Sequence, residues 1–182
     1  MDPVLHLLLP LLFLLAIGID KRKAVLFAPF AILPDFDVLF GLHRAALHSF
    51  LFVLALPVAV IVYSRLRRPD WLPGALLAQF YLASHVVLDL GGVAFLWPFV
   101  QEQFFLDIEV TLTFRPEFHF GYLLDYGMRP LVQVTTTDLI SETGFAMVFL
   151  GALMAVVFRK ESARTLRWFW GVLKDLLSNV RK

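Results

Sequence analysis

Three short segments hold most of the side chains in this chain that could do chemistry. They are Leu33–Asp37 (LPDFD), His43–Ser49 (HRAALHS) and His85–Asp89 (HVVLD), and each lies in or beside a run of apolar residues. Because ionisable side chains are costly in an apolar membrane segment, their presence there indicates a functional site. Histidine and aspartate together are a common ligand set for a divalent metal ion. The candidate metal ligands are His6, Asp37, His43, His48, His85 and Asp89.

The spacing within two of these segments bears on how they reach one ion. His85 and Asp89 are four residues apart, which places both on one face of a helix and lets both reach one ion or an ion pair. Asp35 and Asp37 are two residues apart and would point to nearly opposite sides of a continuous helix. Pro34 favours a break or a helix start there, and a break would let both carboxylates turn towards one cavity.

The third segment combines two histidines with an arginine. His43 and His48 would be about 140° apart around a helix. They would therefore bind two adjacent ions, or one of them would stabilise a metal ligand without binding the metal itself. Arg44 adds a guanidinium group, which suits a phosphate or carboxylate substrate. Simpler explanations stay open for three residues: an interfacial histidine for His6, a snorkelling arginine for Arg44 and a helix cap for Asp35.

The composition indicates a membrane protein that has no thiol chemistry. Of the 182 residues, 59% are hydrophobic, whereas about 45–50% is usual for a soluble domain. Mean hydropathy is +0.77, so we expect one integral membrane unit in a cell membrane. The net charge of +1 gives no indication of nucleic-acid binding, and the absence of cysteine excludes thiolate ligands. We expect one or two divalent ions, zinc first, with manganese, iron or cobalt as alternatives.

Five apolar runs approach the length of about 17–25 residues that a membrane-spanning helix needs. They predict an all-α integral membrane protein with about five transmembrane helices and a mostly extracytoplasmic cap between the last two. The expected spans are residues 3–19, 24–42, 45–64, 72–98 and 143–158.

The basic residues predict an orientation for these spans. Clusters follow the first, third and fifth spans, at Lys21–Lys23, Arg65–Arg68 and Arg159–Lys174. The positive-inside rule places all three in the cytoplasm, so the N-terminus would lie outside and the C-terminus inside. On this multi-pass topology the candidate ligands all fall between the bilayer midplane and the outer face, which favours one site open to the outside.

The chain is expected to have four parts. Within the third, Val110–Phe114 alternates as a strand does, and His119 is either a further ligand or an ordinary surface histidine. The parts are a four-helix transmembrane core with the metal site (1–98), an outer-face cap or loop segment (99–142), the last transmembrane helix (143–160) and a basic amphipathic cytoplasmic tail (161–182).

At these positions the chain resembles the membrane-bound metal-dependent hydrolase family of bacterial and archaeal membranes. The resemblance covers roughly residues 1–100 and consists of an early histidine, LPDxD, HRxxxHS, and SHxxxD followed by a glycine-rich turn and WPF. Where the family has glycine and threonine in HRGxTHS, this chain has Ala45 and Leu47, and Gly91 stands near a frequent threonine. These departures remove hydroxyl groups that could support the ligands. The matching residues are His6, Leu33–Asp37, His43–Ser49, Ser84–Asp89 and Trp97–Phe99.

The pattern is also similar to zinc-dependent phospholipase C and to fungal single-strand nucleases, which hold a metal cluster that cleaves phosphodiesters. This similarity implies that Asp89 bridges to a second ion held by His6. His43 or Asp35 would complete the ligands of that second ion. The ligands that the similarity implies for the first ion are Asp37, His48, His85 and Asp89.

Ligand type, common depth and resemblance together favour a metal-dependent hydrolase at the outer membrane face. A bound ion would lower the pKa of a water molecule towards 7, Asp35 would accept its proton and Arg44 would hold the anionic group. The lipid bilayer is the expected partner, and a phospholipid or another phosphate-containing ester is the expected substrate. The alternatives are a metal-ion or proton transporter and a non-catalytic scaffold whose metal staples short helices.

Overall fold

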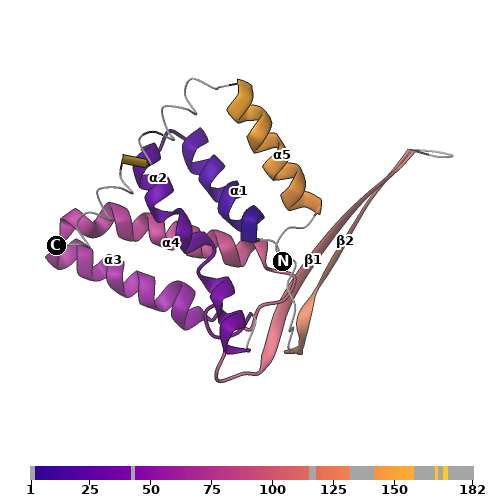
Figure 1. The fold of residues 1–182 in the computed structure, drawn as a ribbon. Coiled ribbons are helices and arrows are strands. Elements are labelled where there is room, and N and C mark those ends of the chain that lie inside the picture. The colour runs from indigo at the N-terminus through magenta and orange to yellow at the C-terminus, as the bar shows by residue number, and fades with distance from the viewer. Residues whose placement is uncertain are drawn as a thin grey trace. The chain divides into compact units, whose positions relative to one another are not determined.

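The computed structural model describes residues 3–41, 44–114, 118–131, 142–157, 167, 170 and 171. The chain divides into two compact units, Met1–Ile140 and Ser141–Lys182 (Figure 1). Every candidate site residue belongs to the first unit, which contains several helices followed by a β-hairpin. The second unit contains α5, Glu142–Val157.

The first half of the first unit consists of short helical pieces. α1 runs over Pro3–Ala16, and α2 over Lys21–Phe27, where the Asp20 side chain accepts hydrogen bonds from two backbone N–H groups of its first turn. Two 3₁₀ helices follow, η1 at Ala28–Ala31 and η2 at Pro34–Phe40. Each has a proline in its first positions, where the missing N–H costs nothing.

The long helices α3 and α4 follow, and each begins after a short helical turn. A π-helical turn, η3 at Leu51–Ala55, runs directly into α3 at Leu56–Arg67. A short 3₁₀ helix, η4 at Pro69–Trp71, then leads into α4 at Leu72–Leu88. α3 packs against α4, and α4 also contacts α1, α2 and η1; Figure 1 labels the four α-helices. α4 is therefore the element around which the other helices are arranged.

Small buried residues let α2 and η1 approach α4 closely. Ala24, Ala28 and Ala31 are buried against Tyr81 in one apolar cluster, and the Tyr81 hydroxyl donates a hydrogen bond of 2.7 Å to the Ala24 carbonyl. A second apolar cluster, of Val53, Leu82 and Val86, joins η3 to α4. The two clusters hold the backbone around the C-terminal half of α4 in place.

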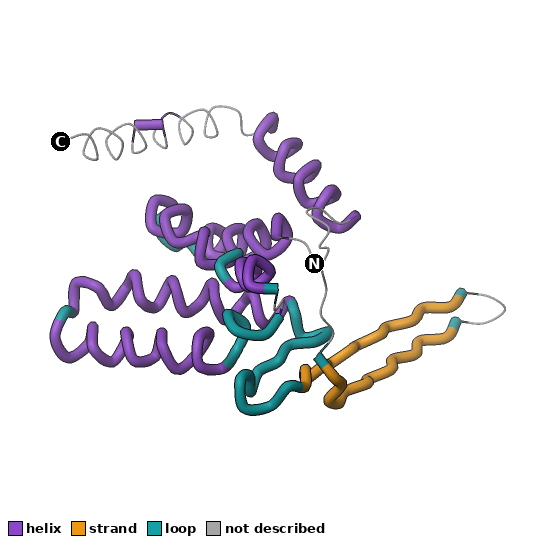
Figure 2. The backbone as a smooth tube through the Cα atoms, turned by 60° about the horizontal axis from the view of Figure 1, so that its bottom comes forward, coloured by secondary structure: helices purple, strands orange, loops and turns teal. Residues whose placement is uncertain are grey.

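The hairpin is hydrogen-bonded to the residues that follow the last turn of α4. β1 at Glu102–Thr113 pairs antiparallel with β2 at His119–Pro130 (Figure 2). Leu106 N–H donates to the Leu90 carbonyl at 2.8 Å, and the Arg129 guanidinium donates to the Gly91 carbonyl. The register gathers large exposed apolar side chains on one face of the hairpin, namely Ile108, Val110, Leu112, Phe120, Tyr122 and Leu124.

The prediction of an all-α protein with about five transmembrane helices is wrong. The described residues form five α-helices and a two-stranded antiparallel sheet. Among them, one helical stretch, Pro69–Leu88, is long and apolar enough to cross a membrane, while α1 is apolar but shorter. The predicted orientation of the termini depended on five spans, so it loses that basis.

The physical reason lies in residues that interrupt the apolar runs. The run 24–42 contains Pro29 and Pro34, and the backbone there changes from α2 into two short 3₁₀ helices. The run 72–98 is helical only to Leu88, after which Gly92 takes a φ of +152° that other residues rarely adopt. Apolar composition therefore did not distinguish a bent segment from a straight span.

The structure describes nearly all of the predicted last span but little of the predicted C-terminal tail. α5 coincides closely with the predicted last span, 143–158, and has the same length of 16 residues. Most of the predicted tail, 161–182, lies outside the described residues. The four-part division of the chain therefore stays a prediction.

Candidate metal centre

Four side chains from three parts of the chain meet in one group, and three of them are buried. Asp35 comes from η2, His48 from the turn before η3, His85 from the last turn of α4, and Asp89 from its C-terminal cap. Each offers one ligand atom, and these atoms all lie within 4.8 Å of one another. The tertiary fold thus gathers a set of two imidazoles and two carboxylates that could hold a metal ion.

His85 is oriented by the backbone of η1. Its Nδ1–H donates a hydrogen bond of 2.6 Å to the Ala31 carbonyl. Because a carbonyl oxygen can only accept, Nδ1 carries the proton and Nε2 is left with its lone pair towards the group. His85 is fully buried, and its Nε2 lies 3.8 Å from Asp89 Oδ2, as expected for residues one helical turn apart.

His48 is oriented in the same sense by Asp37. Its Nδ1 lies 2.9 Å from Asp37 Oδ2, and the same oxygen accepts the Ala45 N–H at 2.9 Å. This places Asp37 behind the imidazole, in the position from which carboxylates commonly orient a metal-binding histidine. His48 Nε2 faces the group, 3.0 Å from His85 Nε2 and 3.4 Å from Asp89 Oδ2.

The electrostatics of the group call for a positive charge at its centre. With both Nδ1 atoms donating outward, the two Nε2 lone pairs would face each other across 3.0 Å unless a proton or a metal ion lies between them. Burial lowers the pKa of His48, but hydrogen bonds to Asp37 and Asp89 outweigh it and raise that pKa to about 9. Burial raises the pKa of Asp89, yet hydrogen bonds with His48 and His6 hold it well below its usual range. A divalent ion would supply the charge that a proton on His48 otherwise provides, so these residues fit a metal.

His6 joins the group through Asp89. It lies on α1, is 2% exposed, and places its Nε2 at 2.7 Å from Asp89 Oδ1. Its ring also stacks on that of His85, with centroids 4.2 Å apart. His6 and His48 therefore approach opposite oxygens of Asp89, which is the arrangement of a carboxylate placed between two positive centres.

Two side chains at the group are partly exposed. The side chains of His48, His85 and Asp89 are 0% exposed, whereas that of Asp35 is 15% exposed and that of Arg44 is 22% exposed. Asp35 Oδ1 lies 3.6 Å from His85 Nε2, and Arg44 Nε lies 3.6 Å from Asp89 Oδ2. The two Asp35 oxygens and Arg44 Nε are themselves buried, so only the remaining parts of these two side chains face the outside.

Arg44 is held in an unusual backbone conformation. Its φ is +62°, a left-handed geometry that costs a residue other than glycine about 1–3 kcal/mol and often marks a functional position. The Arg44 carbonyl accepts the Ala94 N–H at 2.9 Å. The segment that follows Asp89 thus fixes the backbone that presents the guanidinium group.

Two of the predicted positions cannot be placed as side chains. His43 lies outside the described residues, and of His119 only the backbone, at the start of β2, is described. Sequence reasoning missed the Ala31 carbonyl that orients His85, because every residue has such a group and no residue type signals it. The family departure at Ala45 leaves the buried contact of its N–H with Asp37 intact.

Comparison with known proteins places the chain among membrane proteins. The model of a family described as YdjM inner membrane protein matches residues 1–162. The matched stretch includes every residue of the group and the whole hairpin. No curated protein and no solved structure matches the chain. These comparisons support the predicted membrane location, but they give no support to the similarity to hydrolases or to zinc-dependent phospholipase C.

Proposed function

The chain belongs to the YdjM inner membrane protein family, and on that premise we propose that it is a membrane-bound metal-dependent hydrolase of phosphodiesters or related esters. The observation that carries the proposal is the group of four ligand atoms on Asp35, His48, His85 and Asp89 within 4.8 Å of one another. Burying so many ionisable groups together is costly without a purpose, and a bound metal ion supplies one.

The ligand set proposed for the first ion differs in one member from the set implied by family similarity. Asp35 replaces Asp37, because Asp37 is engaged with the far side of the His48 ring while Asp35 belongs to the four-atom group. Mixed imidazole and carboxylate ligands suit zinc, with manganese, iron and cobalt as alternatives. A second ion would use His6 and the Asp89 oxygen that faces it.

The partly exposed side chains of Asp35 and Arg44 beside the group support hydrolysis rather than a purely structural role for the metal. A bound metal ion lowers the pKa of a water ligand towards 7. Arg44, a partly exposed cation 3.6 Å from Asp89 Oδ2, would hold an anionic phosphate by charge-assisted hydrogen bonds. Asp35 offers one ligand atom to the group, and its other carboxylate oxygen would accept the proton of the attacking water. Asp37 would keep His48 in the orientation that binds metal.

The proposed substrate is a phosphodiester in a lipid headgroup. The family is one of inner membrane proteins, so phospholipids are the phosphate esters that this protein meets at highest concentration. A phosphate carries the negative charge that Arg44 is placed to bind. A free phosphodiester with the same charge is a second source of this chemistry, and the assay distinguishes the two.

The test measures metal content and hydrolysis on the same preparations of detergent-purified protein. We expect one or two ions per chain in the wild type, loss of metal in Asp89→Ala, and unchanged metal in Asp125→Ala, a matched control on the exposed face of β2. Phospholipid vesicles and a chromogenic phosphodiester are then compared as substrates. A wild type that takes up no metal even after resupply would refute the proposal.

If the protein binds metal but hydrolyses neither substrate, it would instead be a transporter or a non-catalytic scaffold. The group and His6 together join α1, η2 and α4, so metal ions held there would also connect these elements. Ion flux in proteoliposomes distinguishes a transporter from such a scaffold, because only a transporter moves the ion across the bilayer.

A further inference from the structure

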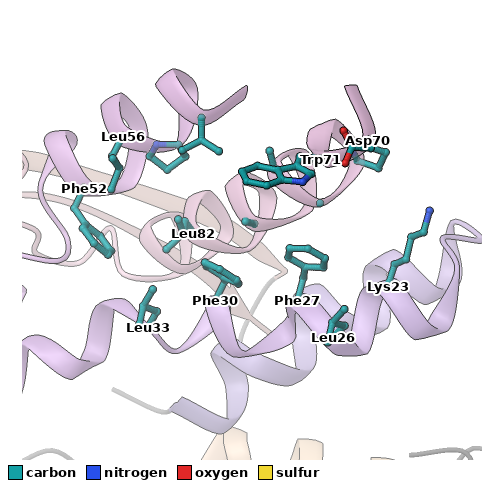
Figure 3. A pocket seen from close by; sticks show the side chains of 16 residues that line it. Lys23, Leu26, Phe27, Phe30, Leu33, Phe52, Leu56, Asp70, Trp71 and Leu82 are labelled. Carbon is teal, nitrogen blue, oxygen red and sulfur yellow. The ribbon is translucent and has the colours of Figure 1, made fainter. Parts of the chain in front are cut away.

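An apolar groove lies between α2, α3 and α4, apart from the metal centre (Figure 3). Its volume is about 610 Å³. Gly74 allows the groove to form, because a Cβ at this position would lie 2.6 Å from the Phe27 ring that builds one wall. The larger side chains of its walls include Phe27, Phe30, Phe52, Leu56, Val60 and Trp71.

The groove is charged at one end only. Among its lining residues Lys23 and Asp70 carry charge, and Figure 3 shows both at the end opposite Phe52 and Leu33. The Asp70 carboxylate is already paired with Arg68, whose Nε lies 3.4 Å from Asp70 Oδ1. Lys23 is exposed, so it gives the mouth of the groove a positive charge.

Further basic residues are near neighbours in sequence of the residues at this mouth. Lys21 and Arg22 precede Lys23 in the first turn of α2, and Arg65 and Arg67 end α3 just before η4. Trp71 is 50% exposed, and the guanidinium carbon of Arg68 lies 4.7 Å from the centre of its ring. Tryptophan beside basic residues is typical of a segment at the membrane–water interface.

We propose that this groove binds an acyl chain of an anionic phospholipid, whose phosphate lies at the Lys23 end. The apolar walls match the acyl chain, and the basic residues match the charge of the headgroup. Anionic lipids are attracted to basic residues near the membrane surface with an energy that corresponds to about a fivefold change in affinity per residue. A zwitterionic lipid would enter the same groove without this gain.

The lipid in this groove is distinct from the substrate of the metal centre. From Trp71 to Leu82 the groove follows eleven residues of α4, which is a rise of about 16 Å. Leu82, at the far end, lies almost one helical turn before His85. A phosphate at Lys23 is therefore too far away to reach the metal ligands, and the inference does not rest on the proposed hydrolase activity.

Native mass spectrometry of the full chain in detergent tests the charged end of the groove. Phosphatidylglycerol and phosphatidylcholine with identical acyl chains are added in turn. We expect one tightly bound phosphatidylglycerol, preferred over phosphatidylcholine by about fivefold or more. Lys23→Gln should lower the affinity for phosphatidylglycerol about fivefold and leave that for phosphatidylcholine unchanged, while Lys23→Arg keeps the preference.

A second pair of variants tests the apolar part. Ala78 lines the groove, so Ala78→Phe should fill it and abolish the tight adduct of either lipid. Ala59→Phe adds the same bulk at an exposed position of α3 outside the groove and should change nothing. Equal affinity for the two lipids in the wild type, or a preference that Lys23→Gln leaves undiminished, overturns the proposal. The comparison of the two lipids with the Lys23 variants tests lipid binding even if Ala78→Phe fails to fold. Unchanged metal content in Lys23→Gln would show that the groove and the metal centre act separately.

Discussion

Two aspartates two residues apart have different roles in the structure, and their amide variants should separate these roles. Asp37 lies behind His48, with its Oδ2 2.9 Å from His48 Nδ1. Asp35 belongs to the four-atom group. Asparagine has nearly the same size as aspartate and keeps one acceptor oxygen, so Asp37→Asn retains an acceptor for the His48 Nδ1–H and removes only the charge.

The expected magnitude follows from these positions. Loss of a carboxylate that supports a metal-binding histidine usually weakens metal affinity about 10–100-fold, which is about 1.4–2.7 kcal/mol. Asp37→Asn should therefore bind the same number of ions with an affinity lower by this factor. Asp35→Asn replaces a charged ligand with a neutral one, so its loss of affinity should exceed that of Asp37→Asn.

Competition titration against a chromophoric zinc chelator, in detergent at constant pH, measures both affinities and stoichiometries. Asp125→Asn, on the exposed face of β2, serves as the control for removing a carboxylate elsewhere. If Asp37→Asn loses its metal while Asp35→Asn retains wild-type affinity, the reasoning fails. The ligand set implied by family similarity, with Asp37 on the ion, would then be the correct one.

Three further predictions concern catalysis, metal and packing. Arg44→Ala should keep its metal but lower kcat/KM for a phosphodiester by about 10²-fold or more, since a lost donor to a reacting anionic group commonly costs that much; loss of metal in this variant would contradict the role. Chelation should lower the midpoint of thermal unfolding, because an ion present at about 100 times its Kd stabilises the folded state by about 2.7 kcal/mol, and resupply of zinc should restore the midpoint. Tyr81→Phe removes the buried hydrogen bond to the Ala24 carbonyl and should destabilise the chain by about 1–2 kcal/mol in denaturant unfolding without changing metal content, and an unchanged unfolding free energy would show that this bond does not hold α2 to α4.

Local patterns predicted those parts of the chain that depend on near neighbours. The spacing of His85 and Asp89 indicated a shared helical face, and the structure places His85 in the last turn of α4 and Asp89 at its cap. The alternation of Val110–Phe114 indicated a strand, and β1 includes these residues up to Thr113. Such patterns are reliable because backbone geometry alone sets which neighbours share a face.

The fold class could not be predicted in the same way. Apolar runs of sufficient length suggested five straight spans, but Pro34 begins a 3₁₀ helix and α4 ends at Leu88. Apolar composition measures the tendency of a segment to leave water, whether it enters a bilayer or a protein core. Backbone breaks decide between these outcomes, and their consequences depend on what the broken segment packs against.

The sequence by itself determined which residue types were available for the metal centre and that they would be buried among apolar neighbours. Only the tertiary structure decided their roles: that Asp35 rather than Asp37 joins the four-atom group, and that the Ala31 carbonyl orients His85. It also decided that His6, far away in the chain, lies 2.7 Å from Asp89. The physical reason is that residue type sets what a side chain can bind, whereas the packing of distant segments sets which of its atoms face one another.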